Sequence, residues 1–99
     1  MKRPSPAKTK RAAREIGEHI TAWRKLQHLT AEQVCQRAGI SRPTLRKVEQ
    51  GDPTVTLETF LNVLRSLGRL DSIVEVLDPY EHALGRARAD QQLPQRVRS

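Results

Sequence analysis

The side chains of this chain that could do chemistry are concentrated in SRPTLRKVEQ, residues 41 to 50. They are Arg42, Thr44, Arg46 and Lys47. Arginine and lysine donate to guanine O6 and N7, and threonine can contact a thymine methyl or a phosphate. Leu45 and Val48 lie three apart in the same segment, so a helix here has an apolar inner side. The segment therefore predicts a basic helix that can enter the DNA major groove.

A second short helix is predicted directly before it. Thr30 can cap this helix, and Gln33 three residues on completes a capping box. Gly39 can end the helix in the left-handed conformation, which costs glycine little. Ser41 can then cap the basic helix, with Pro43 in its first turn. Two helices joined by a tight turn are the expected unit. The alternative is a solvated basic face on an ordinary bundle, but the caps, Gly39 and the apolar spacing favour DNA binding.

Three further helices are predicted around this unit. One covers about 11 to 28, with Ile16, Ile20 and Trp23 on one stripe. Another follows Thr56 and ends at Gly68; its apolar stripe is Leu57, Phe60, Leu61, Leu64 and Leu67. A fifth follows a cap at Asp71 and ends before Pro79. We expect an all-α fold with a DNA-binding domain over 11–78, a flexible basic arm over 1–10, and a polar basic tail over 79–99 that is extended or disordered.

The net charge of +7 and pI near 10.5 favour a polyanionic partner. Residues 1 to 14 hold six Lys or Arg and no acid, whereas residues 15 to 81 hold eight basic and ten acidic groups. Because the middle is nearly neutral, its cations must gather on one face to bind DNA. We expect the basic arm to add contacts to phosphates or the minor groove. Its cations are Lys2, Arg3, Lys8, Lys10 and Arg11.

Several other classes of protein are disfavoured. The single Cys35 excludes an intramolecular disulfide and, next to Val34, is expected to be a buried core residue. His19, His28 and His82 lack metal-ligand spacing, and we find no phosphate loop or nucleophile elbow. We therefore expect no catalytic residue, metal or cofactor, and no enzyme activity. No apolar run reaches the ~18 residues of a membrane span, and no signal peptide is evident, so a cytoplasmic, nucleoid-associated protein is expected.

Residues 16 to 68 resemble the helix-turn-helix domain of the lambda/434 repressor and Cro class, the XRE family. The resemblance implies a partly buried ion pair between Arg24 and Glu49. It assigns base reading to Ser41, Arg42, Thr44 and Lys47. It assigns phosphate binding to Thr30, Gln33, Arg46 and Gln50. Two positions depart from the pattern, because Ala31 and Pro43 stand where some members carry a polar DNA-contacting side chain.

The stretch GDPTVTLETFLNVLRSLGRL is also similar to a narrower group, the HipB-like antitoxins that pair with a HipA-type kinase toxin. That resemblance implies a homodimer that binds an inverted repeat in its own promoter, with the kinase docked on the dimer as co-repressor. A stand-alone XRE-family repressor without a toxin is the alternative.

The fifth predicted helix supports a third hypothesis, a protein-interaction module with DNA binding secondary. Its apolar residues exceed one narrow stripe, so a dimer interface is expected there, with ordinary core as the alternative. The expected interface residues are Leu70, Ile73, Val74 and Leu77.

Overall fold

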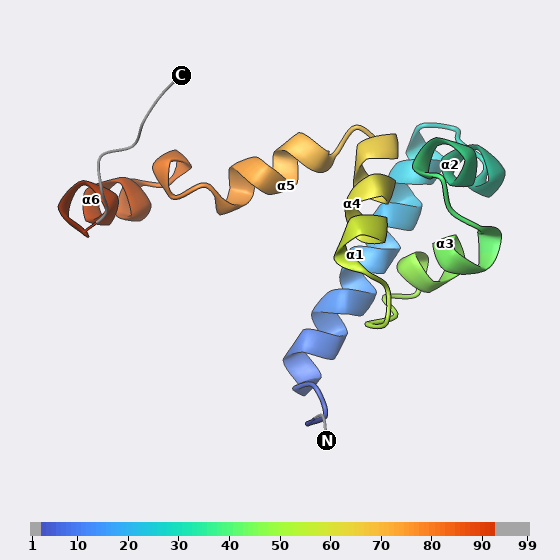
Figure 1. The fold of residues 1–99 in the computed structure, drawn as a ribbon, viewed down its shortest axis with the longest axis horizontal. Helices are drawn as coiled ribbons and strands as arrows, with labels where there is room; N and C mark the ends of the chain where they lie inside the picture. Colours follow the sequence, from blue (N-terminus) through green and yellow to red (C-terminus); the bar gives the residue numbers. More distant parts are fainter. Residues whose placement is uncertain (1–2, 93–99) are drawn as a thin grey trace.

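The computed structural model describes residues 3–92, and the helices there account for all of the regular secondary structure. The elements are α1 (Ala7–Leu26), α2 (Ala31–Ala38), α3 (Arg42–Glu49), α4 (Leu57–Ser66), α5 (Leu70–Leu77), the 3-10 helix η1 (Pro79–Glu81) and α6 (Ala83–Gln92). Helices α1 to α4 form a compact body (Figure 1). Helix α5 leads away from that body, and α6 lies at the far end, on the side opposite α3 (Figure 1).

Helix α1 begins earlier than expected. It starts at Ala7, so the last four residues of the expected 1–10 arm are helical. Pro6 precedes the helix, where no N–H donor is needed for an intrahelical hydrogen bond and its fixed φ is compatible with the chain. The Ala, Lys and Arg residues that follow have high helix propensity. The cations from Lys8 to Arg14 therefore lie on a helix, while residues 1 and 2 lie outside the described part.

The predicted caps of the two central helices are confirmed. Thr30 Oγ1 accepts from the Gln33 N–H at 3.1 Å, and Gln33 Oε1 accepts from the Thr30 N–H at 2.8 Å. Gly39 ends α2 with φ +69°. Ser41 caps α3, and Thr56 caps α4 in the same way. In each of these short helices, a side chain just before the helix accepts a hydrogen bond from a backbone N–H of the first turn, which would otherwise have no partner within the helix.

The fifth helix and the tail differ from expectation. Arg69 precedes α5, so Asp71 lies in its first turn rather than at its cap. The polar segment from residue 79 to 92 folds into η1 and α6, which overturns the five-helix count and the extended tail over those residues. Asp78 Oδ1 accepts from the Tyr80 N–H at 2.9 Å and starts η1, and the Ala- and Arg-rich sequence that follows favours a helix. Residues 93–99 of the expected tail lie outside the described part.

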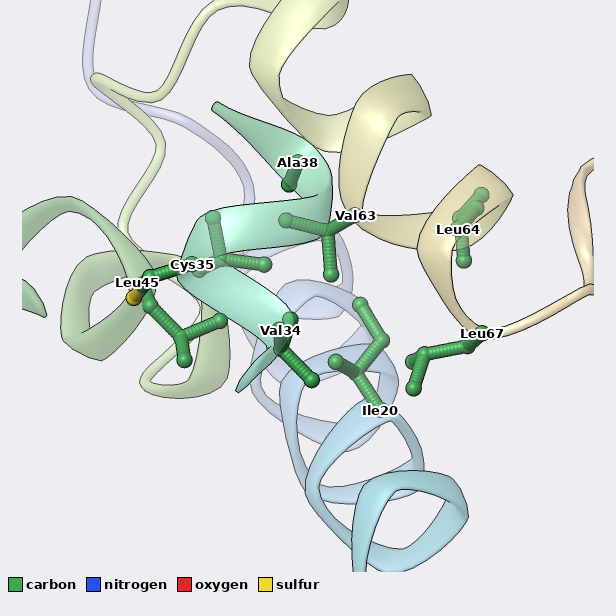
Figure 2. Packing of buried hydrophobic residues seen from close by; sticks show 9 residues of the cluster. Ile20, Val34, Cys35, Ala38, Leu45, Val63, Leu64 and Leu67 are labelled. Carbon is green, nitrogen blue, oxygen red and sulfur yellow. The ribbon is translucent and has the colours of Figure 1, made fainter. Parts of the chain in front are cut away.

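The core sits between α1, α2, α3 and α4. Its buried members are Ile20, Val34, Cys35, Ala38, Leu45, Val48, Val63, Leu64 and Leu67. Ile20 faces Val34 and Leu67, while Leu45 lies beside Cys35 (Figure 2). The stripe expected on α1 is only partly buried, because Ile16 and Trp23 keep 44% and 39% of their surface exposed.

On α4, Leu57 is 70% exposed, so the apolar stripe begins to be covered only at Phe60. Within the described residues, no helix is long and apolar enough to cross a membrane.

Candidate nucleic-acid interface

Helix α3 presents its cations outward because its apolar residues are inserted into the core. Leu45 and Val48 keep 2% and 4% of their surface exposed. Arg42, Arg46 and Lys47 are all exposed on the remaining faces. A helix held in this way by one side leaves its cationic flank accessible to a groove.

The two hydroxyls at the start of α3 are joined to each other. Ser41 Oγ accepts from the Thr44 N–H at 3.3 Å and lies 2.8 Å from Thr44 Oγ1. One hydroxyl donates in this contact, so the other keeps its proton for an outside acceptor. Both predicted DNA contacts are therefore preorganised, and together they offer one hydroxyl donor. Pro43 between them is exposed but has no donor.

The start of α2 supplies a second set of donors. The capping bond of Gln33 uses Oε1, so its Nε2 group can donate to a phosphate. The first turn of a helix also carries a partial positive charge that favours anions. Ala31, one of the two positions that depart from the family pattern, packs partly against the core. It adds no polar contact there.

Arg24 and Glu49 join α1 to the end of α3. Arg24 Nε donates to Glu49 Oε2 at 2.7 Å, and Nη2 donates to Oε1 at 3.3 Å. Arg24 Nη1 also donates to the Leu29 carbonyl at 3.3 Å. Both side chains are largely covered, at 16% and 17% exposure. This two-pronged contact attaches the end of α3 to α1.

Two glycines allow α1 and α3 to approach closely at the same junction. A Cβ on Gly17 would lie 2.5 Å from the Glu49 carbonyl oxygen. A Cβ on Gly51 would collide with the Ala13 carbonyl, and Gly51 also has φ +71°. From the sequence, Gly17 is only an unfavourable residue within a helix, and its role in this contact is not apparent. Two glycines on segments far apart in the chain give no local signal that they meet.

A cleft brings the start of α1 next to the end of α3. Its lining includes Thr9, Lys10, Arg14 and Gln50. Gln50 was assigned to phosphate binding from the sequence, and the fold places two cations of α1 beside it. Arg14 was not assigned any role, although it belongs to the acid-free run of the first 14 residues. The cleft therefore extends the basic surface from α3 onto α1.

Asp52 lies next to this cationic surface. The Thr54 hydroxyl donates to Asp52 Oδ1 at 2.7 Å, and the Thr54 N–H donates at 2.8 Å. These bonds, with a smaller contribution from Lys47, lower the pKa of the Asp52 carboxyl below its usual value. Asp52 is thus held ionised by its own turn, and it shapes the exit from α3.

Cys35 is buried beneath α3, and this burial raises the pKa of its thiol. It fills space between α2 and α3. Among residues 3–92, no three His, Cys, Asp or Glu side chains gather as a metal site.

A family model described as helix-turn-helix matches residues 20–72, which is more than half of the chain. The chain belongs to the XRE helix-turn-helix family. This is a family of DNA-binding regulatory domains. No curated protein and no solved structure matches the chain.

Proposed function

We propose that this protein is a sequence-specific transcriptional repressor, acting on DNA in the cytoplasm, that binds an inverted-repeat operator as a homodimer. The observation that supports this best is the pairing of an anchored inner face of α3 with an exposed cationic outer face. In this mode two copies present their α3 helices to successive major grooves, roughly 34 Å apart. Occupation of a promoter blocks RNA polymerase and represses transcription.

The side chains divide into base readers and phosphate contacts. Arg42 and Lys47 read bases, and the hydroxyls of Ser41 and Thr44 fix the first turn of α3 against the groove edge. The phosphate contacts are Thr30, Gln33, Arg46, Gln50, and the α1 cations Lys10 and Arg14. Phosphate contacts set register and salt dependence, whereas base contacts set sequence preference.

Arg42→Ala tests the base-reading role. We expect a loss of about 1–3 kcal/mol on the selected operator and a relaxed preference at one base position. Arg88→Ala is the matched control, because Arg88 is exposed on α6, on the side opposite α3 (Figure 1). Affinities are measured by fluorescence anisotropy at protein concentrations where both variants have one oligomeric state. Equal losses for the two variants would show that only net charge matters.

The cations of α1 are tested by substitution rather than deletion, because α1 begins at Ala7 and a deletion would remove helix. Lys10→Gln and Arg14→Gln, at the two α1 cations beside Gln50, should together weaken binding to all DNA sequences alike. The slope of log affinity against log salt should become shallower by about 0.9 for each phosphate that is no longer neutralised. An unchanged slope would remove α1 from the interface.

The homodimer part of the proposal draws on the exposed side of α5. Leu70 and Ile73 pack partly against the core, whereas Val74 and Leu77 keep 62% and 75% of their surface exposed. Two of the four expected interface residues are therefore accessible to a second copy. Light scattering after size exclusion, at micromolar concentration, should give the mass of a dimer.

A HipB-like antitoxin role is the finer form of this proposal. Its support is the resemblance of residues 51–70, and its implied partner is a HipA-type serine/threonine kinase. Co-purification from the native host tests it: a kinase that elutes with the chain and sharpens its operator binding supports the antitoxin. A chain that elutes alone and represses fully favours the stand-alone regulator. Repression that persists without specific DNA binding would favour the protein-interaction module.

A further inference from the structure

We propose that Pro43 is a specificity-determining residue of α3 that reads the methyl group of a thymine in the DNA major groove. The proposal rests on the proposed function, because it requires α3 to lie in that groove. It deepens that function by adding a base contact at a residue that has no hydrogen-bond donor. Each half-site of the operator should then contain a T·A pair that is selected through its methyl group.

Pro43 lies in the first turn of α3 and points away from the core. Leu45 and Val48 anchor the inner side of this helix and keep 2% and 4% of their surface exposed. Since successive residues of an α-helix are turned by about 100°, Leu45 lies about 160° from Pro43 around one side of the helix and Val48 about 140° around the other. Pro43 thus occupies the middle of the outer face, and its side chain is exposed.

The residues beside Pro43 leave the centre of this outer face to the proline ring. Arg42 and Thr44 are each turned by about 100° from it, toward the two flanks of the helix. Thr44 is half-buried, and its Oγ1 lies 2.8 Å from Ser41 Oγ, so its hydroxyl is already engaged within the chain. When the N-terminal end of such a helix approaches the base edges, the proline ring is therefore the group placed over them.

The ring is also held rigidly before DNA binds. Proline loses no side-chain conformational entropy when its ring makes a contact. The backbone beneath the ring is fixed by the Ser41 cap at the start of α3 and by the Arg24–Glu49 ion pair at its end. Arg46 and Lys47, one turn later on the same side, supply positive charge that draws this face toward DNA. Because the ring keeps one position, a weak apolar contact can discriminate between bases.

Thymine is the base that such a ring can recognise. In the major groove the base edges present hydrogen-bond donors and acceptors, and the methyl group of thymine is the apolar group among them. The proline ring carries no polar atom that can donate or accept, so it can displace water from the methyl group without leaving a polar group unpaired. Against the amino group of cytosine or O6 of guanine, the same ring would leave a donor or an acceptor without a partner. This chemistry favours a T·A pair beneath Pro43.

The first test removes the methyl group from the DNA and leaves the protein intact. An operator is selected from random duplex DNA, and each thymine of one half-site is replaced in turn by uracil, which lacks only the methyl group. We expect a position at which affinity falls about fourfold, the loss associated with one buried methyl-sized group. Replacing that T·A pair by C·G should also weaken binding. At the same place 5-methylcytosine should bind about fourfold more tightly than cytosine, because it restores the methyl group alone.

The second test removes the ring from the protein. Pro43→Ser introduces a residue that is well tolerated at the start of a helix, so circular dichroism should show unchanged helix content. The variant should bind the thymine and uracil operators with equal affinity, as measured by fluorescence anisotropy. Pro79→Ser is the matched control, because Pro79 is exposed at the start of η1 and lies outside α3. This control should keep the preference of the wild-type chain for thymine over uracil.

The outcomes separate this inference from the function on which it rests. An operator at which no uracil substitution weakens binding would overturn methyl reading and keep the repressor. A methyl preference that survives in Pro43→Ser would assign the contact to another side chain, such as that of Thr44, and would overturn the role of Pro43. A selection that enriches no DNA sequence would overturn the sequence-specific function itself, and the role of Pro43 with it.

Discussion

The junction between α1 and α3 and the arm formed by α5, η1 and α6 are built in opposite ways. At the junction, backbones touch through Gly17 and Gly51, and a covered ion pair adds a second attachment. In the arm, Leu70 and Ile73 pack partly against the core, whereas Val74, Val76, Leu77 and Leu84 are exposed. The junction is closely packed within one chain, whereas the outer half of the arm keeps apolar side chains exposed. The difference separates a junction that fixes the position of α3 from a region whose outer apolar side chains remain exposed.

The largest difference between the two regions should appear in leucine truncations. Leu45→Ala removes a side chain that is 2% exposed beneath α3, and we expect a loss of about 2–5 kcal/mol in the free energy of unfolding. Leu77→Ala on the arm should cost less than about 0.5 kcal/mol when the chain is dilute enough to be monomeric. Urea denaturation followed by circular dichroism measures both. Similar losses would mean that the arm is part of the core.

Alanine substitutions at two glycines test whether the close backbone approach between α1 and the end of α3 requires glycine. Gly51→Ala should cost about 2–4 kcal/mol, because it adds a collision with the Ala13 carbonyl to the strain of a positive φ. Gly68→Ala is the matched control, since Gly68 has the same φ of +71° and no atom within 4 Å of the added Cβ. It should cost about 1–2 kcal/mol. Thermal unfolding of the two variants gives the difference. A Gly51→Ala cost no larger than the control would show that the close approach does not require glycine.

The ion pair of the junction should matter less than its backbone contacts. Glu49→Ala leaves the covered Arg24 without its carboxylate, and we expect a loss of about 1–3 kcal/mol. Operator affinity should return toward wild type at temperatures where the variant is fully folded. Glu18→Ala, an exposed acid on α1, is the control for the change in charge. A variant that melts like wild type yet fails to bind DNA would instead make Glu49 a DNA-binding residue.

The smallest effect on the free energy of unfolding is expected at the turn after α3, and this effect depends on pH. The folded pKa of Asp52 is lowered by the Thr54 hydroxyl and N–H, so the unfolded state binds the proton more readily. The ionised Asp52 carboxylate therefore stabilises the folded chain at pH values above its pKa in the unfolded chain, which is about 4. This stabilisation is lost as the pH falls through the lower pKa that Asp52 has in the folded chain.

Thr54→Val removes the hydroxyl donor, so the variant should be less stable than wild type at neutral pH. The difference should shrink below pH ~4, as measured by urea denaturation at both pH values. A difference that persists in acid would point to packing of Thr54 instead.

The residues around the DNA-binding helix were predictable because their signals are local. The capping box of Thr30 and Gln33, the left-handed Gly39 and the Ser41 cap each act over a single helical turn, so the order of neighbouring residues is enough to place them. The tail from residue 79 was not predictable in the same way. Its pattern lacks an apolar stripe, and α6 is stabilised by η1 contacts that involve Pro79 and Gly85.

The sequence by itself determined the two central helices, their turn, and a cationic outer face, since neighbouring residues decide caps and helical periodicity. Only the tertiary structure decided that Gly17 meets the end of α3, that Lys10 and Arg14 lie beside Gln50, and that the arm leaves its apolar residues exposed. Each of these features joins segments distant in sequence. Their contact depends on how helices pack around a shared core, which no local pattern encodes.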